Sequence, residues 1–344
     1  MSGTTMLRIL SVGPGTTLQD GGRQGYLRYG ITAAGPMDRL AHATANGAVG
    51  SAPDATAIEV SLGGIEVAAE GGPLTVAVAG GAFAVSLGGQ TLAPNVALTL
   101  EPGAALKVRA GAAGAWCYLT VAGDIAVPPV LGSTATHSRS GIGGLDGRAL
   151  RTGDGLAVRP RPFTPLSPSR IEAPWLDRDL DTVRVLLGPQ ADYFDAEAIA
   201  AFLASPWTVS TRSDRMASFL DGPALRHARG HDIVSDGIAM GSIQVPGDGR
   251  PIVLMADRQP TGGYPKIATV IGPDLGRLAQ MRPGSRFRFA AVSLEEAVAA
   301  RHVEAALPFF APTLEPLVRT HFTSEFLLGL NLIDGVYGRS CIEA

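Results

Sequence analysis

The densest group of reactive side chains in this sequence lies between residues 257 and 266. Within ten residues it offers a carboxylate, a guanidinium, an amide, a hydroxyl, a phenol and an amine, from Asp257, Arg258, Gln259, Thr261, Tyr264 and Lys266. The apolar runs 251–256 and 266–271 on either side are bounded by Gly and Pro, which is typical of buried strands. We therefore expect a polar turn around Gly262 and Gly263 at the mouth of a rigid sheet, where functional sites are commonly built.

Three groups of polar side chains could meet in one cleft. An early group contains Gln19, Asp20, Arg23 and Asp38, with Asn46 and Glu59 behind them; a middle group contains Ser133, Thr134, His137 and Arg139; a late group adds Asp214, Arg215, Asp236 and Gln244 to the 257–266 turn. An amide substrate needs donors at its carbonyl oxygen and a base for its N–H or for water. A guanidinium binds both oxygens of a substrate carboxylate. The alternative is that Asp20 with Arg23, and Asp257 with Arg258, form buried ion pairs that only fix loops.

Several other kinds of site are not indicated. No Gly-x-x-x-x-Gly-Lys-Ser/Thr phosphate loop is present, so we do not expect this chain alone to bind ATP in that manner. The histidines lack the spacing of metal ligands, and no metal is expected. The two lysines, Lys107 and Lys266, stand outside any Met-Lys-Met sequence, so biotin, if used, must be carried elsewhere.

The composition predicts many short strands joined by tight turns. Of 344 residues, 46% are hydrophobic and 17% are charged, and 44 are Gly and 25 are Pro. The net charge of −3 gives no reason to expect nucleic acid or an anionic membrane as a partner. Neither a leader segment nor a bilayer-spanning run is found, so we expect a cytoplasmic protein.

The hydrophobic pattern predicts a mainly β protein with a few helices (α+β). Strands are expected at 7–12, 57–62, 65–68, 74–79, 83–87, 96–100, 106–109, 116–121, 182–187, 207–211, 243–245, 252–256, 268–271 and 286–291. Helices are expected at 37–49, 191–203, 274–280 and 294–302. We expect a first half at residues 1–160 with the loop 16–38, a proline-rich connector at 161–174, and a second half at 175–344 with the loop 257–266.

Several motifs in order along nearly the whole chain resemble one known family. They are Gln19-Asp20-Gly21-Gly22-Arg23, Gly35-Pro36-Met37-Asp38, Ser213-Asp214-Arg215-Met216, Ser235-Asp236-Gly237-Ile238, Gly241-Ser242-Ile243-Gln244 and the 257–265 stretch. The chain thereby resembles the biotin-dependent carboxyltransferase-like family. That family includes KipA, the C subunit of bacterial 5-oxoprolinase, chains labelled allophanate hydrolase subunit 2, and a region of urea carboxylase. Ala217 and Phe219 stand where the family usually has Gly and Arg.

The resemblance implies a fold of two cyclophilin-like β-barrel halves and a role within a larger enzyme. The leading expectation is the C subunit of an ATP-dependent 5-oxoprolinase, which opens the lactam to glutamate. Its partners would be a KipI-like B subunit (an allophanate hydrolase subunit 1 homologue) and an A subunit, and ATP would be used by the complex. One alternative is carboxyl transfer from carboxybiotin, held on another polypeptide, to urea, guanidine or a related amide. Another is a KipA-like regulator that binds a KipI-like kinase inhibitor.

Within that scheme each polar residue has a predicted role. Asp257 or Asp236 would act as the base, and Arg23 or Arg215 would hold the substrate carboxylate. Tyr264, Gln259 and Thr261 would orient the carbonyl. Lys266 is a further catalytic candidate, and the predicted substrate-binding set is completed by Asp20, Asp38, Arg139, Gln244 and Arg258.

Overall fold

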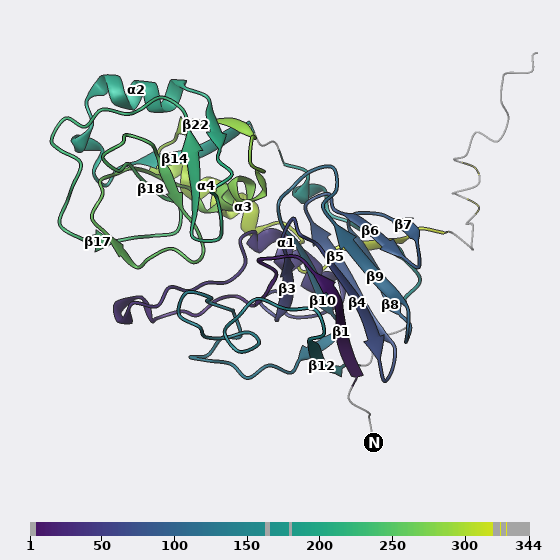
Figure 1. The fold of residues 1–344 in the computed structure, drawn as a ribbon. Helices are drawn as coiled ribbons and strands as arrows, with labels where there is room; N and C mark the ends of the chain where they lie inside the picture. The colour runs from purple at the N-terminus through teal and green to yellow at the C-terminus, as the bar shows by residue number, and fades with distance from the viewer. Residues whose placement is uncertain (1–4, 162–165, 179–180, 319–323, 325–327, 329–344) are drawn as a thin grey trace, which may run out of the picture.

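The computed structural model describes residues 5–161, 166–178, 181–318, 324 and 328. Figure 1 shows two β-rich lobes, with a helix, α1, between them. Four α-helices accompany the strands in the described part of the chain. The predicted mainly β class with a few helices is therefore confirmed, and the C-terminal lobe contains a closed barrel.

The N-terminal lobe consists of two seven-stranded sheets packed on a common core. In the first sheet the order is β11 (Gly123–Ile125), β12 (Gly155–Pro160), β1 (Thr5–Val12), β4 (Ile65–Glu70), β9 (Ala105–Arg109), β6 (Ala84–Leu87) and β7 (Gln90–Leu92). In the second it is β2 (Thr17–Gln19), β3 (Ala57–Val60), β10 (Cys117–Val121), β5 (Leu74–Gly80), β8 (Val96–Leu100), β13 (Ser169–Glu172) and β23 (Thr313–Pro316).

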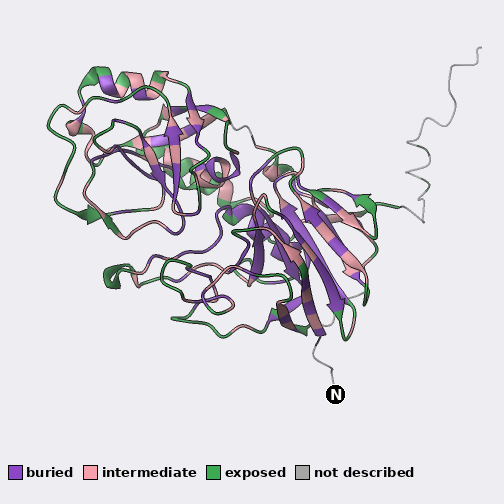
Figure 2. Cartoon of the chain, viewed as in Figure 1, coloured by how far each residue is buried: buried purple, intermediate pink, exposed green. Residues whose placement is uncertain are grey.

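The two sheets differ in how much of their surface is covered. In β1, residues alternate between buried and partly exposed, because only one face meets the core. In β10 all five residues are buried, because α1 (Arg39–Ala48) packs on the outer face of β10 and β5. Figure 2 shows these central strands as almost continuously buried. The second sheet therefore forms a rigid support for the loops that reach the other lobe.

The C-terminal lobe is a closed barrel of seven strands. Their order is β14 (Thr182–Leu187), β21 (Lys266–Val270), β18 (Ser242–Gln244), β19 (Ile252–Leu254), β16 (Ala217–Asp221), β15 (Trp207–Val209) and β22 (Arg286–Ala291). A parallel pairing of β14 with β22 closes the ring, and the other pairs are antiparallel. The interior contains Trp207, Phe202 and Phe289, among other apolar side chains.

The polar segment 257–266 is not the hairpin turn that the sequence suggested. Strand β18 lies between β19 and β21 and pairs antiparallel with both, so β19 and β21 run in the same direction. The end of β19 and the start of β21 therefore lie at opposite ends of the barrel, and the connection must travel along it. On the way, β20 (Thr261–Gly262) pairs with β17 (Asp236–Gly237) outside the barrel.

The helices follow the expected positions, with one exception. α1 begins after Asp38, whose carboxylate accepts a hydrogen bond from the Ala41 amide at 3.2 Å. The helix predicted at 191–203 is interrupted: a 3-10 turn, η3 (Ala191–Tyr193), is followed by α2 (Ala196–Ala204). The interruption has a local cause, because the side chain of Asp195 caps α2 through the Ala198 amide. α3 (Gly272–Gln280) and α4 (Leu294–Ala305) complete the set.

The chain crosses between the lobes more than once. β13 lies within the proline-rich 161–174 segment and joins the N-terminal lobe's second sheet, where β23 from near the end of the chain pairs with it. The division into residues 1–160, 161–174 and 175–344 stays a prediction. No helix in the described residues is long and apolar enough to cross a membrane.

Candidate functional site

A cavity of about 720 Å³ lies between the two lobes. Its walls combine apolar side chains with a few polar ones: Met37, Leu62, Trp116, Met216, Met255, Leu278 and Met281, together with Thr17, Arg139, Asp214, Arg215 and Asp257. This volume is within the usual range of small-molecule sites, and few polar groups on a mainly apolar wall are typical of them. Of the predicted site residues, Asp257, Arg215 and Arg139 line this cavity.

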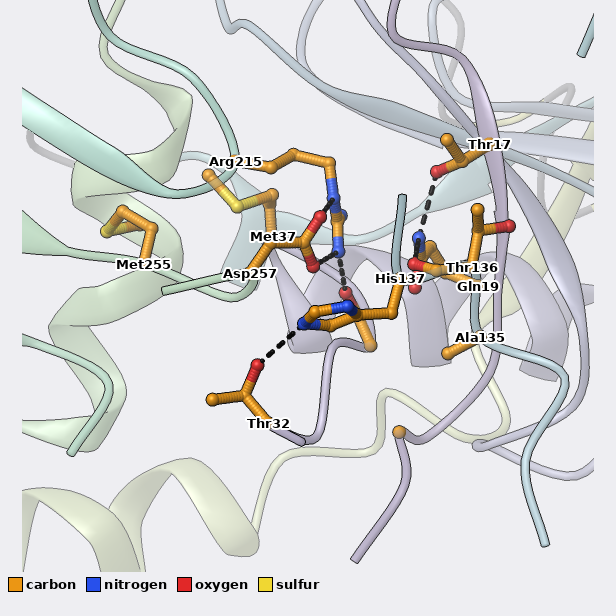
Figure 3. A network of polar contacts seen from close by, with 12 residues as sticks. Thr17, Gln19, Thr32, Met37, Ala135, Thr136, His137, Arg215, Met255 and Asp257 are labelled. Atoms are coloured by element: carbon orange, nitrogen blue, oxygen red, sulfur yellow. Dashed lines mark hydrogen bonds and ion pairs between the residues drawn. The ribbon is translucent and has the colours of Figure 1, made fainter. Parts of the chain in front are cut away.

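A buried charge cluster connects the lobes at this cavity. The Arg215 guanidinium donates from Nε and a terminal nitrogen to the two carboxylate oxygens of Asp257, at 2.9 and 2.8 Å. It also donates to Glu59 of the N-terminal lobe, and to the Gly35 carbonyl at 2.8 Å. Figure 3 shows Arg215 facing Asp257 in this arrangement. Since its donors are already engaged in the protein, the geometry favours a positioning role for Arg215 over direct binding of a substrate carboxylate.

Glu59 is fixed from three sides. Its Oε2 accepts from the Met37 amide at 2.7 Å and from the Tyr118 hydroxyl at 2.8 Å, while Oε1 accepts from Arg215. Burial raises the pKa of Glu59, against the lowering effect of Arg215 and these hydrogen bonds. Burial alone would lower the pKa of Arg215, but Asp257 and Glu59 raise it, so the guanidinium stays charged.

A histidine lies beside this cluster on a loop of the N-terminal lobe. The Nε2 atom of His137 is 3.0 Å from the Thr32 hydroxyl (Figure 3), which also donates to the Arg258 carbonyl at 3.3 Å. Burial lowers the pKa of His137, while the Asp257 carboxylate opposes that shift. Its Nδ1 accepts from the Ser140 amide at 3.2 Å, so the neutral ring carries its proton on Nε2, toward Thr32. Both ring nitrogens are thus engaged within the protein, and His137 fixes the loop beside the charge cluster.

Arg23 is buried and is not paired with Asp20. It donates to the carbonyls of Val130, Ser133 and Ala135, and one terminal nitrogen has no hydrogen-bond partner. Asp20 instead accepts from Ser133 and Thr134, which ties the early loop to the 133–137 loop. The suggested Asp257–Arg258 pair is also not formed: Arg258 donates to the Ile238 and Met255 carbonyls, and burial, with Arg39 nearby, lowers its pKa to about 10.

Arg139 and Asp214 are the charged groups on the cavity wall with capacity left for a ligand. Arg139 is exposed, and it has no ion pair with any described residue. One oxygen of Asp214 accepts from the amides of Met216 and Ala217, so its side chain is oriented by the backbone. The cavity therefore contains a guanidinium without an ion pair in the described chain, in addition to the buried Arg215–Asp257 pair.

Other predicted residues gather at the far end of the barrel. Lys266 is 2% exposed, and its Nζ lies 2.5 Å from Asp236 Oδ2 and 3.2 Å from the Gly237 carbonyl. Gln244 is buried and donates to the Tyr264 carbonyl, while Thr261 and Tyr264 are exposed and Gln259 is partly buried. The Lys266 amine, through its hydrogen bond and charge, lowers the pKa of Asp236. These residues do not line the cavity, because the 257–266 segment runs along the barrel.

Asp38 holds the lobes together. It is fully buried, forms an ion pair with Arg178, and accepts from Gln280 Nε2 at 2.9 Å. Burial would raise its pKa, but Arg178 and these hydrogen bonds hold it below the usual value. In the described residues no group of three His, Cys, Asp or Glu side chains is placed to hold a metal.

The sequence pattern placed Glu59 behind the early polar group, but it indicated neither the apolar part of the wall nor Tyr118. Three methionines of the apolar wall lie next to polar motif residues in the sequence: Met37, Met216 and Met255. This adjacency is the only sequence feature that could have pointed to them. Tyr118 lies in a fully buried strand and gave no separate signal.

Comparison with known proteins identifies the family to which this chain belongs. Residues 29–291 match the family model for the carboxyltransferase domain, subdomain A and B. The chain belongs to the carboxyltransferase domain family. Among carboxyltransferase-domain proteins, the 5-oxoprolinase C subunit of Escherichia coli (strain K12) is 38% identical over 297 residues, which cover 86% of this chain and 94% of that protein.

Two solved structures share the fold of this carboxyltransferase-domain chain. The K. lactis urea amidolyase superposes with a TM-score of 0.81 at 28% identity, and 89% of this chain corresponds to 20% of that one. TTHA0988 superposes with a TM-score of 0.74 at 33% identity, covering 83% of this chain and 55% of that one. The chain thus spans about a fifth of the first protein and about half of the second.

Proposed function

We propose that this chain is the C subunit of an ATP-dependent 5-oxoprolinase. The observation that carries the proposal is the 38% identity to the E. coli protein of that name, over 94% of its length. By comparison, the urea amidolyase of Saccharomyces cerevisiae is 30% identical, and this chain covers 17% of it. In this proposal a KipI-like B subunit and an A subunit complete the enzyme, and ATP is bound outside this chain.

The cavity suits a small lactam that carries a carboxylate. Arg139 would bind the substrate carboxylate, because an unpaired guanidinium matches its two oxygens. The lactam ring would lie against Met216, Met255 and Trp116. ATP supplies the activation, since a phosphorylated lactam oxygen makes the ring carbon far more reactive toward water than a stable amide.

Asp257 would act as the base that takes a proton from water. Both of its oxygens accept from Arg215, but a carboxylate offers about four acceptor positions. Arg215 and Glu59 would fix its orientation. The protonated Asp257, which lines the cavity, would then release this proton to the ring nitrogen as the C–N bond breaks. Water adds to the phosphorylated ring carbon and the C–N bond breaks, which leaves an acyl phosphate. A second water releases phosphate, so one ATP and two waters yield glutamate, ADP and phosphate.

The test is ATP-dependent glutamate release from 5-oxoproline by the complete complex. We expect turnover to need this chain, and Asp257→Asn to lower kcat by roughly 10²–10⁴-fold, the contribution of a positioned base. Glu70→Gln, in the exposed pair with Arg8, is the control for the charge change. Equal glutamate release with and without this chain would overturn the proposal. Asp236→Asn tests the other group of polar residues, around Lys266 at the far end of the barrel. If Asp236→Asn abolished turnover and Asp257→Asn did not, the reaction would take place at that end of the barrel.

The second candidate is carboxyl transfer, which the family model and the urea amidolyase fold favour. Neither lysine suits attachment of biotin to this chain: Lys107 lies within β9, 3.2 Å from Glu66, and Lys266 is buried. The biotin would therefore be carried by another polypeptide. Bicarbonate-dependent carboxylation of urea or guanidine with a biotinylated partner, and no glutamate release, would favour this candidate.

A further inference from the structure

A second cavity, of about 510 Å³, lies between the lobes where α1, α3 and α4 meet. Met37 lines both cavities, and the Tyr118 hydroxyl joins them by donating to Glu59 and accepting from the Asp38 amide. The side chains of the mechanism proposed above, Asp257 and Arg139, do not line the second cavity. Its lining is instead rich in charge.

One pair of these charges is already neutralised within the protein. Asp38 is bound by Arg178 and by Gln280, so this carboxylate and this guanidinium compensate each other. His42, also on the lining, is neutral at physiological pH, because burial lowers its pKa to about 4. Asp54, a second acidic group of the lining, is exposed to solvent, which screens its charge.

Three other charged side chains on this wall are left without such compensation. Arg39, Arg301 and Glu304 form no ion pair or hydrogen bond with a side chain of the described chain. Arg39 and Arg301 are exposed and can turn toward a ligand, whereas Glu304 is partly buried. Burial is the main cause that raises the pKa of Glu304, and the negative charge of Asp38 adds to it. The positive charges of Arg178 and Arg301 lower this pKa, but by less.

We propose that this second cavity binds a free acidic amino acid, with Arg39 and Arg301 on its two carboxylates and Glu304 on its ammonium group. Arginine binds carboxylates through two parallel hydrogen bonds, and an ammonium ion supplies the directly bound cation that Glu304 lacks. The two guanidiniums and the carboxylate that would touch the ligand sum to a single positive charge, which complements the single negative charge of such a ligand, while Asp54 lies exposed to solvent. Leu275 and Met240 would pack against its methylene groups.

The choice of glutamate among acidic amino acids rests on the proposed function, because glutamate is its product. The assignment of an acidic amino acid as the ligand rests only on the charges around the cavity. Glutamate in this place would be a product held away from the reacting atoms, next to α1, which begins after Asp38.

Isothermal titration calorimetry on the purified chain tests the site. We expect glutamate to bind with one-to-one stoichiometry, and glutarate, which lacks the ammonium group, to bind at least tenfold more weakly. Arg301→Gln should weaken both ligands at least tenfold. Glu304→Gln should weaken glutamate but not glutarate, which loses a like-charged neighbour. Arg286→Gln, an exposed arginine on β22, is the matched control and should change neither.

Two results would overturn the assignment. One is the lack of saturable binding of glutamate, aspartate and glutarate at millimolar concentration. The other is glutamate binding that Arg139→Gln removes and Arg301→Gln does not, since that places the ligand in the first cavity. Neither measurement depends on turnover or on partner proteins, so failure of the 5-oxoprolinase assay and failure of this site are distinguishable.

Discussion

Individual residues between the lobes carry charges that the protein has removed from water. Arg215 is shared between Asp257 of its own lobe and Glu59 of the other. Removing one partner of such a cluster leaves an uncompensated buried charge, which is strongly destabilising. Buried charges of this kind therefore hold the site in one geometry, and the titratable groups around them make stability depend on pH.

His42 gives this dependence a defined direction. Its ring is fully buried against Tyr118, and burial lowers its pKa to about 4 in the folded protein. The unfolded chain, with the ordinary value near 6.5, binds the proton more readily between these limits. Stability is therefore lost as the pH falls from 6.5 to 4.

We predict that the His42→Gln variant is less sensitive to acid than the parent protein. The difference in unfolding free energy between the two should change by about 3 kcal/mol between pH 7 and pH 4, since a glutamine does not titrate. Urea unfolding at several pH values measures this. Parallel pH profiles for the two proteins would show that His42 is not the titrating group.

At the level of elements, close approach of α3 to the N-terminal lobe depends on a glycine. A Cβ on Gly276 would lie 2.6 Å from Asp38 Oδ1 and 2.9 Å from a terminal nitrogen of Arg178. Glycine inside a helix costs about 1 kcal/mol relative to alanine. Alanine does not fit at this position, because the buried ion pair between Asp38 and Arg178 occupies the space that its methyl group would take.

We expect Gly276→Ala to destabilise the protein by roughly 1–3 kcal/mol, as for other overpacked sites, despite its gain in helix propensity. Thermal unfolding followed by circular dichroism gives the size of the effect. In an Asp38→Ser background, which shortens the opposing side chain, the same substitution should cost less. An equal cost in both backgrounds would mean that the contact with Asp38 is not the cause.

On the scale of the whole molecule, Gln280 at the end of α3 joins the lobes. Its amide nitrogen donates to Asp38 and to the Trp116 carbonyl at 2.9 and 3.0 Å, and its oxygen accepts from the amides of Ala115 and Trp116. Arg282 adds bonds to the carbonyls of Gly111 and Gly114. Because these buried hydrogen bonds all cross the interface between the lobes, they couple the hydrophobic core of one lobe to that of the other.

We predict that the two lobes unfold in one cooperative transition. Differential scanning calorimetry of the whole chain should show a single peak, with equal calorimetric and van't Hoff enthalpies. Gln280→Ala, which leaves several buried groups without partners, should shift that peak downward as a unit. Two resolved peaks in the parent protein would indicate that the lobes fold independently.

The local sequence pattern was sufficient to predict most helices and strands, and the motifs were sufficient to predict the family. The strands at 74–79 and 182–187 and the helix at 294–302 were predicted within a few residues, because apolar periodicity and Gly or Pro boundaries are properties of neighbouring residues. Short strands such as β2, β7 and β20 were not predicted, since two or three residues carry too little pattern to stand out.

The sequence by itself determined the β-rich class, the polar motifs and the membership of the carboxyltransferase domain family. Only the tertiary structure decided which of those motifs meet. Asp257 pairs with Arg215 and not with its neighbour Arg258, and Lys266 lies at the other end of the barrel from Asp257. The physical reason is that β18, earlier in the chain, inserts between β19 and β21, and a pairing between distant strands leaves no trace in local spacing.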